Sequence, residues 1–326
     1  MNVKIKKIVV IIPHRGIGDV IFHLPLLKTL HKSYNKRIVI ISNKSNKSKS
    51  ILKEENFLEK IIYFNFNRTN IFNYILRFIK LREIIKNLNA EILILTDASK
   101  RLVIPIFFCK ANKKVYLGIK SFADFLFKKK FKEIPLANHL LNLIKSLQLS
   151  SPEYSYILNN RWIKKKINYG QSLKKPYIFF NLDSHHNHNN WDISGFKKII
   201  DKIKKSASVF INTSPNNLKF FKNDLKKYLN KSNIIITSKF SIIKLIKTIS
   251  NCEIIIGNES GPICIGAALN KKVISIYSDK TSKPESGVIS KNIKYFNTSK
   301  LNKITIIHKI YKNIKKNWRR ERDSNP

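Results

Sequence analysis

Short runs of β-branched residues alternate with longer segments of helical period along most of this chain, and this alternation limits its fold more than any other feature. In the first half, the runs lie at 7–12, 37–42, 60–64, 91–96 and 115–118. Apolar residues at helical spacing fill the segments between them, such as 20–33, 71–88 and 136–149. This order is typical of βαβ units, in which helices cover a parallel sheet. The sequence therefore predicts an α/β fold.

A second series of runs follows at 177–181, 208–212, 233–237, 253–257 and 272–277. Between the two series, the segment 150–174 interrupts the alternation with a proline, paired asparagines, a lysine run and a glycine, which are typical of a linker. A chain of 326 residues has room for two domains of about 150 residues each. We therefore predict four parts, namely an N-terminal Rossmann-like domain over 1–160, a hinge over 161–174, a C-terminal Rossmann-like domain with a terminal helix over 175–318, and a disordered polar tail over 319–326.

Several classes of protein are disfavoured by what the sequence lacks. No apolar run reaches the 18 or so residues that a membrane-spanning helix needs. The first residues carry lysines as a signal peptide does, but the apolar run that follows covers only 8–12, so we predict a first strand there. The three cysteines, Cys109, Cys252 and Cys264, show no Cys-x-x-Cys pairing. Reduced thiols are typical of the cytoplasm, so we expect a cytoplasmic protein without a metal site.

The charge balance is strongly basic. The formal net charge is +43, and 10 of the 63 basic residues are arginine. Lysines spread over every solvated face keep a protein soluble, which is one interpretation of this pattern. The other is attraction to a polyanion, either nucleic acid or the anionic leaflet of a membrane. Because arginine makes the bidentate contacts to guanine, the excess of lysine argues against specific nucleic-acid recognition.

The first strand-to-helix loop contains two of the nine glycines, Gly16 and Gly18, followed by Asp19. In open α/β sheets, ligands bind at the carboxyl ends of the strands, where this loop falls. Its glycine spacing does not match a dinucleotide fingerprint. Asp19 has two possible roles, as the N-cap of the following helix or as a general base that accepts a proton from an acceptor hydroxyl.

A late strand-to-helix loop is built from small and polar residues. After Gly257 it continues as Asn258, Glu259, Ser260, Gly261 and Pro262. Small residues let a phosphate approach backbone N–H groups at a helix start, and a serine hydroxyl can add a donor. A proline in a first helical turn is also an ordinary start signal, so the loop has a structural interpretation as well.

Taken together, the two loops resemble those of glycosyltransferase family 9, the heptosyltransferases. The first motif is Gly18-Asp19-Val20 followed by Leu24-Pro25, and the second is 257–262 followed by Gly266-Ala267-Ala268-Leu269. Intermediate positions agree with this resemblance, namely 115–118, His139, Trp191 and Phe196. The resemblance implies a GT-B fold, in which two Rossmann-like domains face each other across a cleft.

The resemblance also implies a reaction. It matches Asp19 to the catalytic aspartate, places Gly16 and Gly18 in the acceptor-side loop, and assigns donor binding to Asn258, Glu259, Ser260, Gly261 and Pro262. The expected enzyme is inverting and metal-independent, has no cofactor, and transfers a heptose-like sugar from a nucleotide diphosphate donor such as ADP-heptose. The expected acceptor is a lipopolysaccharide core or related glycan, at the inner face of the cytoplasmic membrane, where the lysines would bind anionic lipid.

Three departures from the family pattern keep another interpretation open. Asn189 stands where a basic residue is usual, Cys264 replaces a histidine, and the segment 278–281 replaces a Gly-Pro-Thr turn. A catalytically inactive relative that binds anionic membrane, glycan or nucleic acid would fit these losses and the charge. A nucleotide-sugar epimerase of the same fold is a third possibility, but it leaves the match at 18–20 unexplained.

Overall fold

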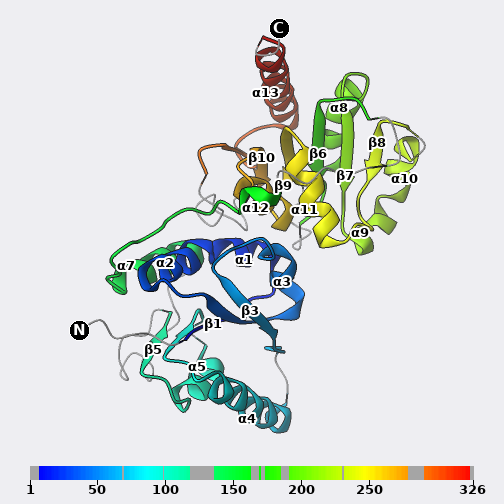
Figure 1. The fold of residues 1–326 in the computed structure, drawn as a ribbon. Helices are drawn as coiled ribbons and strands as arrows, with labels where there is room; N and C mark the ends of the chain where they lie inside the picture. The colour runs from blue at the N-terminus through cyan, green and yellow to red at the C-terminus, as the bar shows by residue number, and fades with distance from the viewer. Residues whose placement is uncertain are drawn as a thin grey trace. The chain divides into compact units, whose positions relative to one another are not determined.

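The chain forms two compact units, Met1–Tyr156 and Ile157–Pro326, in a computed structural model. Figure 1 shows their elements along the chain. The structure describes residues 7–67, 70–97, 99–117, 136–162, 169, 173–184, 191–229, 231–277 and 290–323. The division falls before the predicted end of the first domain, because residues after 156 bond to the second unit. Leu158 N–H donates to the Ala268 carbonyl oxygen at 2.7 Å, and the Ser250 hydroxyl donates to that of Trp162 at 3.1 Å.

The first unit contains a five-stranded parallel sheet in the order β3-β2-β1-β4-β5. Its strands are β1 (Ile8–Ile12), β2 (Ile38–Ser42), β3 (Leu58–Tyr63), β4 (Ile92–Leu95) and β5 (Lys113–Tyr116). Every residue of β1, β2 and β4 is buried. Strands covered on both faces are continuously apolar, which is why these runs stand out in the sequence.

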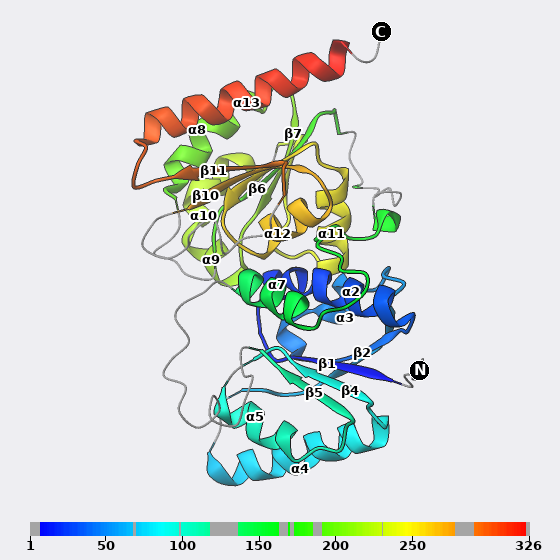
Figure 2. The same cartoon turned by 90° about the vertical axis from the view of Figure 1, so that its left-hand side faces the viewer.

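Helices cover both faces of this sheet (Figures 1 and 2). One face carries α1 (Ile17–Phe22), α2 (Leu24–Tyr34), η1 (Lys44–Asn46), α3 (Ser48–Ile51) and α7 (Leu136–Ser146). The other carries α4 (Ile71–Leu88) and α5 (Lys100–Phe107). The single helix predicted over 20–33 is instead two helices that meet at His23. Pro25 explains the break, because it lacks the N–H that a continuous helix would use there.

The second unit contains a six-stranded parallel sheet in the order β11-β10-β9-β6-β7-β8. Its strands are β6 (Tyr177–Asn181), β7 (Ser208–Asn212), β8 (Ile234–Ile236), β9 (Ile254–Asn258), β10 (Lys272–Tyr277) and β11 (Ile293–Asn297). The sequence predicted the first five of these strands in chain order but not β11. That strand lies at the sheet edge and is only partly buried, so its apolar pattern is weak.

The helices of the second unit close its core. They are η2 (Asn160–Trp162), α8 (Ile193–Ile203), α9 (Pro215–Phe220), α10 (Lys222–Leu225), η4 (Lys226–Tyr228), α11 (Ile242–Asn251), α12 (Gly261–Ala268) and α13 (Lys303–Asp323). Ile306, Ile310 and Ile314 of α13 are buried in the same core as Phe180 and Phe196. Among the helices that the structure describes, none has the length and apolar character to span a membrane.

The prediction of a disordered tail over 319–326 is wrong for its first part. Helix α13 continues through residues 319–323 to Asp323. These positions hold three arginines and a glutamate, and both residue types are good helix formers. The end of the apolar period therefore did not mark the end of the helix. Residues 324–326 lie outside the described part of the chain.

Candidate active site

The loop between β1 and α1 holds the Asp19 carboxylate in a defined position. Gly16 is the N-cap of α1, and its N–H donates to Asp19 Oδ2 at 2.8 Å. Asp19 is the third residue of the helix, and its carboxylate accepts from the N-cap backbone. The N-cap role that the sequence suggested for Asp19 therefore falls to Gly16 instead. Gly18 lies between these two residues, in the same turn.

The backbone of this loop is tied to the segment that follows β2. Asn46 Nδ2 donates to the His14 carbonyl oxygen at 3.0 Å, and the Ser45 hydroxyl donates to the Arg15 carbonyl oxygen at 3.1 Å. Asn46 is fully buried and also hydrogen-bonds Ser42 at the end of β2. Two loops at the carboxyl ends of adjacent strands therefore hold each other, which restricts the positions that Asp19 can take.

His23 supports the other end of α1 from inside the fold. The side chain is fully buried, and burial, with the nearby His14, lowers its pKa to about 3, so the imidazole is neutral. Nδ1 lies 2.6 Å from the Asp19 carbonyl oxygen, which can only accept, so Nδ1 carries the proton. Nε2 lies 2.7 Å from the Thr96 hydroxyl, which also lies 2.9 Å from the Ile11 carbonyl oxygen. His23 is therefore a packing residue of the first unit.

The half-buried Asp19 carboxyl has the electrostatic setting of a proton acceptor. Burial raises its pKa, and the effect exceeds the opposing influence of the His14 imidazole and the Gly16 N–H. The rings of His14 and His23 lie 5.5 Å apart, so His14 is next to both groups. A carboxylate with a raised pKa is a stronger base at neutral pH than an ordinary surface aspartate.

Replacing Gly16 by alanine should displace this carboxylate without unfolding the loop. A Cβ there would lie 2.8 Å from Asp19 Oδ2, while the backbone, with φ −78°, suits alanine. A displacement of about 1 Å at a reacting group can cost up to about 100-fold in rate, so we expect the transfer reaction that the family resemblance implies to slow by about 10- to 100-fold. The melting temperature and the Kd for donor should stay near wild type. A parallel fall in melting temperature and turnover would indicate damage to the fold instead.

In the second unit, Asn258 ends β9 and is fully buried. Its Nδ2 donates to the Leu182 carbonyl oxygen, and its Oδ1 accepts from Trp191 N–H at 2.9 Å. The nitrogen and the oxygen of this side-chain amide therefore each hold one backbone position, at Leu182 and at Trp191. Asn258 is a positioning residue in this structure, and its predicted contact with donor stays a prediction.

Ser260 is the N-cap of α12, and Gly261 and Pro262 are the first two residues of that helix. Its hydroxyl accepts from Asn181 Nδ2 at 2.9 Å and donates to the Asn258 carbonyl oxygen at 2.9 Å. The first turn of a helix presents backbone N–H groups that have no partner within the helix, which suits an anion. The helix start lies where the sequence predicted it, whereas the Ser260 hydroxyl donates within the loop, so its role as a donor to phosphate stays a prediction.

A chain of polar side chains, not recognised in the sequence, leads to Ser260 across four strands. The Thr237 hydroxyl, just after β8, donates to Asn212 Oδ1 at 3.0 Å, and Asn212 Nδ2 donates to Asn181 Oδ1 at 2.7 Å. Asn181 in turn donates to Ser260. We call these four residues the polar ladder. Its sequence signal was the polar residue that ends three of the apolar runs, at 181, 212 and 237.

Two acidic residues of the second unit differ in their surroundings. Asp183, also not predicted, accepts at Oδ2 from the Thr213 hydroxyl, the Ser214 N–H and Asn217 Nδ2, at 2.8–3.0 Å. Because three donors occupy this oxygen, we infer that Asp183 has a structural role and fixes the start of α9. Glu259 donates its N–H to the Ile276 carbonyl oxygen, and its charge adds to the burial that raises the pKa of Tyr295. Glu259 thus faces an aromatic hydroxyl at the edge of the sheet.

The remaining predicted positions divide into core residues and residues outside the described part. Trp191 and Phe196 are buried and pack edge to face, with ring centroids 4.8 Å apart. Cys264 is buried within α12, and His139 lies on α7. Asn189 and the segment 278–281 lie outside the residues that the structure describes. Within the described ranges, no group of three His, Cys, Asp or Glu residues could hold a metal ion.

Solved structures resemble this chain over nearly its whole length. A family 9 glycosyl transferase from Veillonella parvula is 18% identical, with 97% of this chain and 91% of that chain covered and a TM-score of 0.73. The E. coli ADP-heptose lps heptosyltransferase II is 14% identical, covering 89% and 90%, with a TM-score of 0.69. The E. coli heptosyltransferase WaaC with ADP-2-deoxy-2-fluoro heptose is 14% identical, covering 94% and 100%, with a TM-score of 0.72. These likenesses confirm the GT-B type of fold.

The family of this chain is identified from its sequence. A search among curated proteins finds no match to the chain. The family model described as Glycosyltransferase family 9 (heptosyltransferase) matches residues 132–314, more than half of the 326 residues. The chain therefore belongs to glycosyltransferase family 9 and is a glycosyltransferase.

Proposed function

We propose that this enzyme transfers a heptose-like sugar, with inversion, from ADP-heptose to a lipopolysaccharide core or related glycan. The observation that carries the proposal is the Asp19 carboxylate, which is held by the Gly16 N–H and whose pKa is raised by burial. A base of this kind, in a family of sugar transferases, suits deprotonation of an acceptor hydroxyl.

In the proposed reaction, Asp19 takes the proton of the acceptor hydroxyl as that oxygen bonds to the anomeric carbon of the donor. The bond between this carbon and the diphosphate oxygen breaks, and ADP leaves with the electron pair. Attack from the face opposite the leaving group inverts the anomeric centre. The role of Asp19 is proton transfer, and it forms no covalent intermediate.

The second unit is proposed to bind the donor at the start of α12. Support comes from the helix start beside Ser260, because backbone N–H groups there can stabilise the charge of a leaving diphosphate. The polar ladder fixes Ser260 before donor arrives, so little reorganisation is needed. ADP-heptose is favoured as donor because the similar WaaC structure holds ADP with a fluorinated heptose.

The proposed surroundings of the reaction follow from the charge and the residues of the site. A formal net charge of +43 favours an anionic glycolipid acceptor and a peripheral position at the inner face of the cytoplasmic membrane. Asp19 supplies the base, and the N–H groups of α12 can stabilise the leaving diphosphate. We therefore propose a reaction that needs neither metal nor cofactor.

Calorimetric titration with ADP-heptose, UDP-glucose and GDP-mannose, all in EDTA, tests the proposal. We expect saturable binding of ADP-heptose and, with lipopolysaccharide core glycolipid added, transfer of its sugar. Binding of UDP-glucose or GDP-mannose instead would show that ADP-heptose is not the donor. No binding to any of them would favour the catalytically inactive alternative, and turnover that disappears in EDTA would contradict the metal-free reaction.

A further inference from the structure

The first half of α4 presents large apolar side chains to solvent. Five of them are about half exposed or more, namely Ile71 (73%), Phe72 (69%), Ile75 (49%), Leu76 (50%) and Ile79 (55%). The face of this helix that packs in the core consists of other residues further along it. A helix on the surface of a globular protein normally covers its outward side with polar residues. Five exposed apolar side chains on consecutive turns therefore call for an apolar environment.

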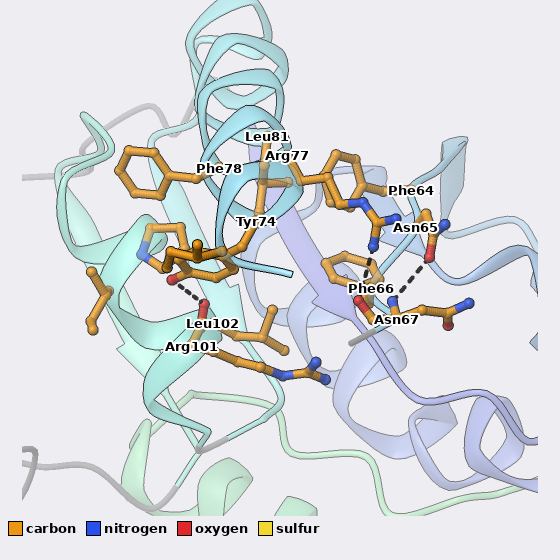
Figure 3. A pocket seen from close by; sticks show the side chains of 13 residues that line it. Phe64, Asn65, Phe66, Asn67, Tyr74, Arg77, Phe78, Leu81, Arg101 and Leu102 are labelled. Carbon is orange, nitrogen blue, oxygen red and sulfur yellow. Dashed lines mark hydrogen bonds between the residues drawn. The ribbon is translucent and has the colours of Figure 1, made fainter. Parts of the chain in front are cut away.

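Helix α5 extends this apolar surface. Ile104 in the middle of this helix, Phe107 at its end and Phe108 just after it are 39%, 51% and 57% exposed. A pocket of about 520 Å³ is lined by residues of both helices, Ile71 and Ile104 among them, and by residues 64–67 (Figure 3). We call these eight residues, with the pocket, the α4–α5 surface. Exposed apolar side chains gathered on neighbouring helices are typical of an interaction site.

Basic side chains accompany the apolar ones. Arg77 and Arg101 line the pocket among phenylalanines and leucines, and Arg77 Nη1 donates to the Asn67 carbonyl oxygen at 2.9 Å (Figure 3). Further along α4, exposed Lys80, Arg82 and Lys86 follow the apolar turns. The one acidic residue within the sequence of α4 and α5 is Glu83.

We propose that the α4–α5 surface docks on an anionic lipid bilayer. This inference rests on the membrane position proposed above and names the part of the chain that makes the contact. The apolar side chains would enter the boundary between headgroups and acyl chains, and the arginine and lysine side chains would reach lipid phosphates. A second copy of the chain fits less well, because a symmetric contact would bring these basic residues against each other.

The test compares two double variants that change side chains of similar exposure. Phe72→Gln with Leu76→Gln removes apolar groups from the α4–α5 surface. Ile304→Gln with Leu229→Gln, whose parent side chains are 76% and 51% exposed in the second unit, is the control. Glutamine adds no charge and suits a helix, so neither pair should lower the melting temperature. Each protein is sedimented with phosphatidylcholine vesicles and with vesicles containing phosphatidylglycerol, without donor or acceptor.

We expect wild type and control to bind the anionic vesicles equally, and the α4–α5 variant to bind at least about tenfold more weakly, since it loses two apolar side chains. Equal binding by the α4–α5 variant would overturn the proposal, as would equal binding of wild type to both kinds of vesicle. A dimer of wild type in light scattering that the variant lacks, without vesicle binding, would assign the surface to a second copy. No transfer is measured, so failure of the proposed reaction would leave this result intact.

Discussion

Replacing Asp19 by asparagine is expected to lower turnover by about 10²- to 10⁴-fold, the usual contribution of a general base, while ADP-heptose still binds. Asparagine keeps an oxygen that can accept the Gly16 N–H, so the loop should hold its shape. The measurement is kcat for sugar transfer beside the Kd for donor from calorimetry. Turnover within threefold of wild type would exclude Asp19 as the base.

The structure also predicts how Asp19→Asn changes the stability of the fold. Burial raises the pKa of Asp19, so the folded state binds a proton more tightly than the unfolded state. Stability contributed by this group is therefore greatest below the unfolded pKa and falls as the pH rises through the folded one. An asparagine at this position cannot ionise, so the variant should melt at the same or a higher temperature at neutral pH. In wild type, turnover should rise with pH over the window in which this stability is lost.

Asp192→Asn is the matched control, because Asp192 also accepts a backbone N–H at a helix start. Although burial opposes it, hydrogen bonds from Lys303 and Ser194 lower the pKa of Asp192 to about 2. Its contribution to stability is present at neutral pH and is lost as the pH falls through that value. This variant should melt at a lower temperature than wild type and keep its kcat. The two substitutions thus move stability in opposite directions.

Replacing Gly257 by alanine should cause the largest loss of stability, about 3 kcal/mol or more. Gly257 of β9 pairs with Asn181 of β6. A Cβ at Gly257 would lie 2.3 Å from the Asn181 carbonyl oxygen and 2.7 Å from the Asn181 Cβ. Backbone cannot move aside as a side-chain tip can, so the strands must separate. Because Asn181 carries the polar ladder to Ser260, donor affinity should fall as well. Urea unfolding and calorimetry measure both effects.

Ser275→Ala provides the control for this strand position. Ser275 is the residue of β10 opposite Gly257, and it is fully buried. Its hydroxyl has no hydrogen-bond partner among the residues that the structure describes. Alanine should therefore leave the urea midpoint unchanged or raise it. If Gly257→Ala also left the midpoint unchanged, the close approach of β6 and β9 would not be a constraint on the fold.

The sequence predicted the elements better than their interactions. Buried strands such as β1 are apolar throughout, so their positions were visible, whereas partly buried β11 was not. The motif at Asp19 was found from its resemblance and its place after a strand. The polar ladder could not be predicted, because it requires the spatial order of β8, β7, β6 and β9, which differs from their order in the chain. The apolar residues of α4 were visible in the sequence, but which of them the fold leaves uncovered was not.

The position of β6 in its sheet has a consequence for synthesis of the protein. β6 pairs with β7, which follows soon afterwards, and with β9, which is made only after β7, β8 and α11. Until β9 emerges from the ribosome, one edge of β6 with Ile178 and Phe180 has no partner strand from this sheet. Unpaired apolar edges attract other chains, so the nascent enzyme passes through an aggregation-prone stage. That stage ends with the same pairing that brings Ser260 to Asn181, so the loop proposed to bind the donor takes its final shape only when β6 and β9 have paired.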